Sequence, residues 1–152
     1  MENAIMQISW LAQRQFMDLL GEERFRLTIP QFQTLLYLKQ AETRCKMSEL
    51  ADATRQSAAS LTGVIDRLIE KQLVERSRHE RDRRQVIVAV TPQGSTLVAE
   101  IQQARRQQLQ HALAHLPGHD VDTLLHLLDR VMEGMVTLIN VPDEHSIVDQ
   151  HS

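Results

Sequence analysis

Residues 50–76 read Leu-Ala-Asp-Ala-Thr-Arg-Gln-Ser-Ala-Ala-Ser-Leu-Thr-Gly-Val-Ile-Asp-Arg-Leu-Ile-Glu-Lys-Gln-Leu-Val-Glu-Arg. A short helix is expected near residues 47–53, followed by a linker, 54–56, that has no apolar side chain. Ser57 is of a residue type that caps helices, and it predicts a longer helix over residues 58–72. One face of that helix is apolar and carries Leu61, Val64, Ile65 and Leu68. A short helix, a tight turn and a longer helix form the helix-turn-helix arrangement.

Downstream of this helix the sequence pattern changes from helical to extended. Leu73-Val74 begins one extended stretch, and residues 85–91, Gln-Val-Ile-Val-Ala-Val-Thr, form a second one that is rich in β-branched side chains. Residues 78–84 between them are polar throughout. Two strands joined by a charged tip predict a β-hairpin, although the tip lacks an Asn-Gly turn. A hairpin that follows a helix-turn-helix is called a wing.

Further helices are expected where apolar residues recur at helical spacing, at about 2–20, 28–41, 92–116 and 120–139. Thr91 is expected to cap the third of these, ahead of a proline in its first turn. The last helix has a wide apolar face, so we expect it to pack against a partner chain as well as its own. The polar tail, 141–152, is expected to be flexible. The fold class is therefore mainly α, with a small β-hairpin wing.

The distribution of charge favours a local interaction with nucleic acid. The net charge of −3 argues against a protein that coats nucleic acid through bulk charge. Residues 72–84, however, carry five arginines and three acidic side chains, a net +2, which leaves −5 for the rest of the chain. A compact basic segment on an acidic body is typical of a local DNA contact.

Composition and motifs exclude several other classes. A hydrophobic content of 42% and a charged content of 24% are ordinary for a globular protein and argue against disorder. The single cysteine, Cys45, excludes a disulfide framework within the chain and any cysteine-based zinc finger. The start of the chain has no signal-peptide pattern, and the longest apolar run, 86–90, is too short to span a bilayer. Without a phosphate-binding loop or a nucleophile elbow, we expect neither an enzyme nor a bound cofactor.

The predicted elements suit duplex DNA. A helix fits the major groove, and small side chains near its start, here Ser57, Ser60 and Thr62, let it approach the bases closely. A positive hairpin tip can reach the flanking minor groove. The alternative is a helical dimeric module that binds a ligand or a protein without DNA, with a hairpin that is merely solvated.

Several motifs resemble those of the MarR family of bacterial transcription regulators. Residues 50–76 resemble its helix-turn-helix. Residues 82–91, Asp-Arg-Arg-Gln-Val-Ile-Val-Ala-Val-Thr, look like its wing signature of Asp, any residue, Arg, five residues and Leu-Thr, with Val90 in place of the leucine. Residues 91–94 and 27–32 also match the family pattern. The resemblance implies a cytoplasmic, nucleoid-associated homodimer that represses genes until a small-molecule effector releases it.

The resemblance also implies a division of the chain. Residues 1–27 and 92–140 would form a helical dimerisation region, and residues 28–91 the winged helix-turn-helix domain. In such a dimer each subunit places its recognition helix, 57–72, in the major groove of a pseudo-palindromic operator. No membrane partner is implied.

The resemblance assigns roles to individual residues. Arg84 matches the wing arginine that enters the minor groove, and Asp82 the acid that orients it. Thr62 and Arg67 match positions that contact DNA, mostly at phosphates. Gly63 stands where many relatives carry a side chain that reads bases. The complete set of expected DNA-contacting residues is Gln56, Ser57, Ser60, Thr62, Arg67, Arg81, Asp82, Arg83 and Arg84.

Two candidate sensing sites have plainer interpretations as well. His111 and His115 lie four apart on an expected helix and could share a metal ion. Zinc-sensing relatives take further ligands from the second helix, where this chain has Phe32 and Gln33, so we favour surface histidines. Cys45 lies between two basic residues, Arg44 and Lys46, which could lower its pKa, but a plain loop cysteine is favoured.

An effector pocket is a third possibility. Trp10, Phe16 and Phe32 could line such a pocket, as in relatives that respond to drugs and phenols. Core packing is the plainer interpretation for each of them.

Overall fold

The recognition helix, α4 (Ala58–Glu70), begins at the predicted cap. Ser57 has an extended backbone, and its Oγ accepts a hydrogen bond of 3.1 Å from the backbone N–H of Ser60. The predicted apolar face is buried at Leu61, Ile65 and Leu68. The helix ends two residues earlier than expected, because Gln72 adopts a left-handed backbone with φ of 59° and turns the chain toward the wing.

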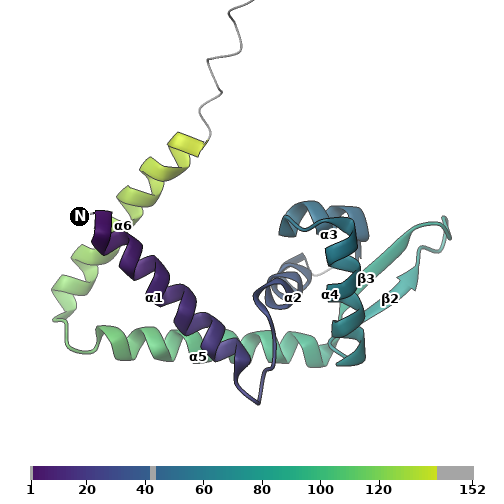
Figure 1. Ribbon diagram of the computed structural model, residues 1–152, viewed down its shortest axis with the longest axis horizontal. Helices are drawn as coiled ribbons and strands as arrows, with labels where there is room; N and C mark the ends of the chain where they lie inside the picture. Colours follow the sequence, from purple (N-terminus) through teal and green to yellow (C-terminus); the bar gives the residue numbers. More distant parts are fainter. Residues whose placement is uncertain (1, 42–43, 140–152) are drawn as a thin grey trace, which may run out of the picture. The chain divides into compact units, whose positions relative to one another are not determined.

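Figure 1 shows the computed structural model, which describes residues 2–41 and 44–139. The other helices are α1 (Glu2–Gly21), α2 (Ile29–Ala41), α3 (Met47–Thr54), α5 (Pro92–Leu113) and α6 (Gly118–Ile139). The mainly α prediction is confirmed. The described residues fall into two compact units, which divide between Gln108 and Leu109. The predicted flexible tail, 141–152, lies outside the described residues.

The wing is part of a three-stranded antiparallel sheet of order β1-β3-β2. Its hairpin consists of β2 (Val74–Arg78) and β3 (Val86–Val90), which pair without a break from Val74↔Val90 to Arg78↔Val86. The predicted hairpin is thereby confirmed. The third strand, β1 (Cys45–Lys46), was not predicted, because two residues at the end of a polar stretch show no alternating pattern.

Aliphatic side chains from α2, α3, α4, β3 and α5 form one core in the first unit. Leu35, Leu50, Leu61, Ile65 and Val88 are completely buried. Figure 1 shows α3 and α4 beside the hairpin, so one packed body carries both the helix-turn-helix and the wing. This shared core positions the functional elements relative to each other.

The start of α5 is fixed tightly against the end of the helix-turn-helix. As predicted, Thr91 caps the helix, because its Oγ1 accepts a 3.1 Å hydrogen bond from the Gly94 N–H. The same hydroxyl donates to the Gln72 carbonyl at 2.7 Å. A Cβ on Gly94 would lie 2.2 Å from the carbonyl oxygen of Leu73, so only glycine fits here.

The second unit begins within the last turns of α5, at Leu109, and includes α6. Helix α5 stops at Leu113 rather than Leu116, and α6 begins at Gly118 rather than Asp120. None of the side chains of α6 is buried, and those of α1 are buried only at Leu19 and Leu20 within its described part. The exposed apolar residues of α6 include Leu124, Leu125, Leu128, Val131, Met132 and Met135. None of the helices in residues 2–41 and 44–139 combines the length and the hydrophobicity that a membrane span requires.

Candidate nucleic-acid interface

The outward face of the recognition helix carries four of the predicted DNA-contacting residues. Ser57, Ser60, Thr62 and Arg67 are all exposed. Thr62 Oγ1 donates to the Ala58 carbonyl at 2.8 Å, so its side chain lies flat against the helix. Arg67 is 3.9 Å from the Glu70 carboxylate, a weak contact that leaves the guanidinium accessible. Gly63 is also exposed, and a Cβ there would meet nothing within 4 Å.

Gln56 lies differently from the other predicted residues. Its Nε2 donates to Thr34 Oγ1 of α2 and to Thr54 Oγ1 of α3, both at 3.0 Å. Thr34 is completely buried and donates in turn to the Pro30 carbonyl. Within the described residues, Gln56 Oε1 is buried and has no hydrogen-bond partner. The side chain therefore ties the turn of the helix-turn-helix to α2, and a base contact would require it to break both hydrogen bonds.

Asp82 organises the tip of the wing. Its Oδ1 accepts a 3.1 Å hydrogen bond from the Arg84 backbone N–H, and its Oδ2 accepts one of 3.2 Å from Gln85 Nε2. Its carbonyl accepts a further 3.0 Å bond from the Gln85 N–H. Asp82 thus holds Arg84 through the backbone N–H and not through the guanidinium. Arg81, Arg83 and Arg84 are all exposed there.

An ion pair absent from the sequence-based predictions connects the wing to the recognition helix. Arg76 of β2 donates to the Asp66 carboxylate of α4 at 2.7 Å. The two residues are ten apart and belong to different elements, so no helical or strand spacing could identify the pair. An apolar cavity of about 480 Å³ lies beside it between α3, α4 and the wing. Its lining includes Met47, Leu61, Thr62, Arg76, Arg84 and Val86.

The three aromatic residues of the predicted effector pocket do not gather in one place. The rings of Phe16 and Phe32 pack edge to face, with centroids 5.1 Å apart, and the Arg105 guanidinium lies 4.5 Å from the Phe16 ring. Phe32 is buried in the core, which fits the plainer interpretation. Trp10 is exposed and lies under Arg14 instead.

The two histidines of the predicted pair, His111 and His115, do not lie on the same helix. Only His111 belongs to α5, because the helix ends at Leu113 and His115 falls in the turn that follows. The expectation that both lie on one helix is wrong. Among the described residues, no group of three or more His, Cys, Asp or Glu side chains could hold a metal ion.

Cys45 is neither a loop residue nor activated by its neighbours. It lies in β1, pairs with Val88 and is buried. Burial raises the pKa of the thiol above its ordinary value, and the Glu49 carboxylate raises it further. The expectations of a loop cysteine and of a pKa lowered by Arg44 and Lys46 are both wrong.

We therefore expect Cys45 to react slowly in the native protein. At neutral pH its alkylation by iodoacetamide should be at least about tenfold slower than in guanidinium chloride, because burial and a raised pKa both reduce the accessible thiolate. The rate should rise at alkaline pH. The stability that the protonated thiol contributes should be present below its unfolded-state pKa and be lost as pH rises through the folded-state pKa. Mass spectrometry at timed intervals measures the reaction, and equal rates in the two conditions would contradict the expectation.

Comparisons with known proteins agree with this geometry. The sequence profile of the MarR family matches residues 27–86. The transcriptional repressor NicR of Pseudomonas putida is 31% identical over 109 residues, which cover 72% of this chain and 68% of NicR. The multiple antibiotic resistance protein MarR of Salmonella typhimurium is 30% identical over 107 residues, 70% of this chain and 74% of that protein.

Solved structures extend the likeness to the whole fold. Wild-type MarR from E. coli superposes with a TM-score of 0.72 at 26% identity, over 86% of this chain and 95% of that one. A mutant of S. aureus MepR bound to an oligodeoxyribonucleotide has the same fold, with a TM-score of 0.71 at 18% identity, over 88% of this chain and 96% of that one. The protein belongs to the MarR family of winged helix-turn-helix transcription regulators, which are DNA-binding proteins and not enzymes.

Proposed function

We propose that this protein is a homodimeric repressor that binds a pseudo-palindromic operator and releases it when a small-molecule effector binds. Helix α4 enters the major groove and Arg84 enters the minor groove. The observation that carries the proposal is the capped, exposed face of α4, which the Asp66–Arg76 ion pair joins to a wing with three exposed tip arginines. The repressor named NicR and the DNA-bound MepR support repression and DNA binding respectively.

The proposed division of labour follows the exposed surfaces. Residues 28–91 form the DNA-binding domain, and residues 1–27 and 92–140 form the dimerisation region. The exposed apolar side chains of α1 and α6 support the latter, because faces of this kind are rarely left in water. The site of action is the bacterial cytoplasm, at the nucleoid, where operator DNA lies. The contact of Phe16 with Phe32 and Arg105 is the best candidate border for an effector site.

The dimer can be tested on α6. Leu128→Ala should raise the dimer dissociation constant by about 30- to 150-fold, because the symmetric interface loses two apolar side chains worth roughly 1–1.5 kcal/mol each. The neighbouring Asp129→Ala is the control, since it removes a charged side chain from the same helix. Sedimentation velocity over a dilution series measures both. A parent protein that sediments as a monomer at micromolar concentration would contradict the proposal.

DNA binding can be tested through its salt dependence. If the dimer neutralises about eight phosphates, the logarithm of the affinity should fall against the logarithm of the salt concentration with a slope near −7. Fluorescence anisotropy with a pool of genomic duplexes measures this slope. Absent or salt-independent binding would favour the alternative, a dimeric module that binds a ligand or a protein without DNA.

A further inference from the structure

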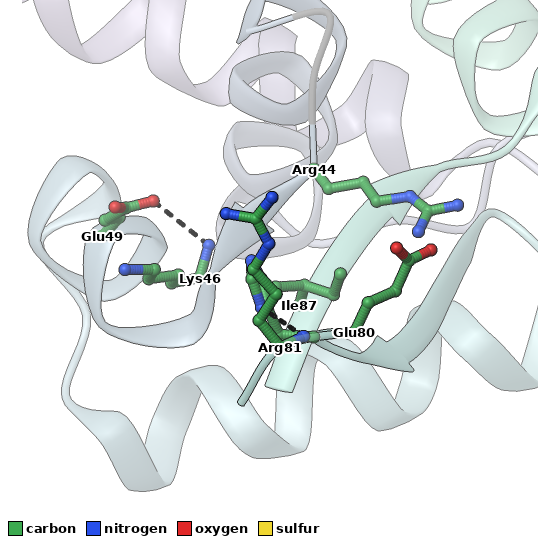
Figure 2. A pocket seen from close by; sticks show the side chains of 7 residues that line it. Arg44, Lys46, Glu49, Glu80, Arg81 and Ile87 are labelled. Atoms are coloured by element: carbon green, nitrogen blue, oxygen red, sulfur yellow. Dashed lines mark hydrogen bonds between the residues drawn. The ribbon is translucent and has the colours of Figure 1, made fainter. Parts of the chain in front are cut away.

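A second cleft, of about 520 Å³, lies against the wing but away from the recognition helix. Three cationic side chains line it from three different segments: Arg44 before β1, Lys46 in β1 and Arg81 in the wing (Figure 2). The floor is Ile87 of β3, which is only 6% exposed although it lies on the outer face of the sheet. The sequence-based predictions included Arg81 but neither Arg44 nor Lys46.

The strand register places this cleft on the opposite face of the sheet from Arg76. Directly paired residues share a face, and the face alternates along a strand. Lys46 pairs with Ile87, whereas Arg76 pairs with Val88, the next residue along β3. Arg76 and Arg84 line the apolar cavity beside α4. The hairpin therefore carries cationic side chains on both of its faces.

The charge of the cleft suits a single phosphate group. Arg44, Lys46 and Arg81 contribute three positive charges, and Glu49 and Glu80 contribute two negative ones, so the cleft is net positive with His79 neutral. The Glu49 carboxylate is engaged at the start of α3, where it accepts a 3.2 Å hydrogen bond from the Lys46 backbone N–H (Figure 2).

The cations of the cleft are available to a ligand. Across the part of the chain that the structure describes, none of the three forms an ion pair. All three residues are exposed to solvent. A phosphate oxygen could therefore be bound without first breaking an internal ion pair.

We propose that this cleft binds a backbone phosphate of the DNA strand on the far side of the minor groove. The inference rests on the proposed function, in which the wing enters that groove. The minor groove of B-DNA is only about 6 Å wide, so a wing that inserts a tip arginine into it has one phosphate backbone on each of its two sides. The strand next to α4 meets the face that carries Arg76. The opposite strand meets the outer face, where Arg44, Lys46 and Arg81 converge.

The first test is a double variant, Arg44→Ala with Lys46→Ala, measured by anisotropy on duplex DNA. Loss of one phosphate contact per subunit should reduce the magnitude of the salt slope by about 2 and lower the affinity by roughly 10- to 60-fold near 0.1 M salt. The matched control is Arg24→Ala with Arg106→Ala, which removes two exposed arginines outside the cleft and should keep the parent slope. Arg44→Ala alone should give part of the slope change, so the test survives if the double variant melts early.

The second test removes charge from the DNA instead of the protein. Duplexes with a neutral methylphosphonate at single backbone positions should identify one phosphate per half-site. Neutralising that phosphate should weaken DNA binding by the parent but not by the double variant. Glu80→Gln should act in the opposite direction and tighten binding about two- to threefold, because it removes a carboxylate beside the phosphate.

Three results would overturn the inference. The double variant could keep the salt slope of the parent and bind DNA within twofold of the parent. Alternatively, every methylphosphonate position could weaken DNA binding by the parent and by the double variant to the same extent. Isothermal titration could also show that the parent binds inorganic pyrophosphate and the double variant does not while both bind DNA alike, which would make the cleft a site for a free anion. In each of these cases the parent still binds DNA with a steep salt slope. Failure of the proposed function would give a different result, because DNA binding by the parent itself would then be absent or independent of salt.

Discussion

Replacing Arg84 with alanine is expected to weaken operator binding by roughly 30- to 1000-fold. The dimer loses one charge-assisted contact per subunit, each worth about 1–2 kcal/mol, or about 2–4 kcal/mol in total. Folding should change little, because Arg84 is exposed at the tip of the wing and lone surface charges contribute little to stability. Anisotropy at one fixed salt concentration, with thermal melts alongside, measures both quantities.

Two further variants make the Arg84 result specific. Asp82→Ala should weaken binding less. The substitution removes the 3.1 Å hydrogen bond to the Arg84 backbone N–H but keeps the Arg84 guanidinium. Arg130→Ala, an exposed change in α6, should leave the affinity for DNA intact. Binding by Arg84→Ala within twofold of the parent would show that the wing arginine does not enter the groove.

Among the glycine-to-alanine substitutions in this chain, Gly94→Ala should cause the largest loss of stability. The new Cβ would lie 2.2 Å from the Leu73 carbonyl oxygen and 2.9 Å from Val90 Cγ2, so backbone has to move. We expect the free energy of unfolding to fall by about 2–4 kcal/mol, with a drop in Tm of about 5–15 °C. Thermal and urea unfolding followed by circular dichroism measure the change.

The matched control is Gly63→Ala in the recognition helix. A Cβ there meets nothing within 4 Å, and alanine favours a helix over glycine by about 1 kcal/mol. The Gly63 variant should therefore be as stable as the parent or more stable. Equal melting of the two variants would show that the start of α5 yields more easily than the close approach to Leu73 suggests.

The sequence predicted those parts of the fold that depend on local chemistry. The caps at Ser57 and Thr91 are side-chain bonds to a residue three positions away, so the local sequence is enough to identify them. The β-branched, apolar run of β3 likewise shows in the sequence. The strand β1 did not, because its two residues become a strand only by pairing with β3, some forty residues further along the chain. Helix ends at Glu70 and Leu113 were missed by two or three residues for a similar reason, since packing decides where a helix stops.

The candidate interface was predictable only in part. A family pattern can identify a wing arginine, because the position follows from the signature. It cannot show that Gln56 turns inward to Thr34, which is 22 residues away, or that Asp66 meets Arg76. Burial also reversed the expected chemistry of Cys45, because flanking charges matter less than the core into which the thiol points. Arg44 and Lys46 were missed because only the folded sheet brings them beside Arg81.

In the proposed complex, the uninterrupted pairing of β2 with β3 and the Asp66–Arg76 contact would divide operator reading into two separable tasks. In the proposed complex, the face of α4 would read the bases, while the length of the tip, residues 79–85, would set how far from α4 the minor-groove contact falls. Because the tip lies beyond the last paired residues, insertions there can lengthen its reach without disturbing the helix. On the proposed function, the position of the minor-groove contact and the base preference could therefore change through mutations in different segments, and each property could evolve while the other is retained.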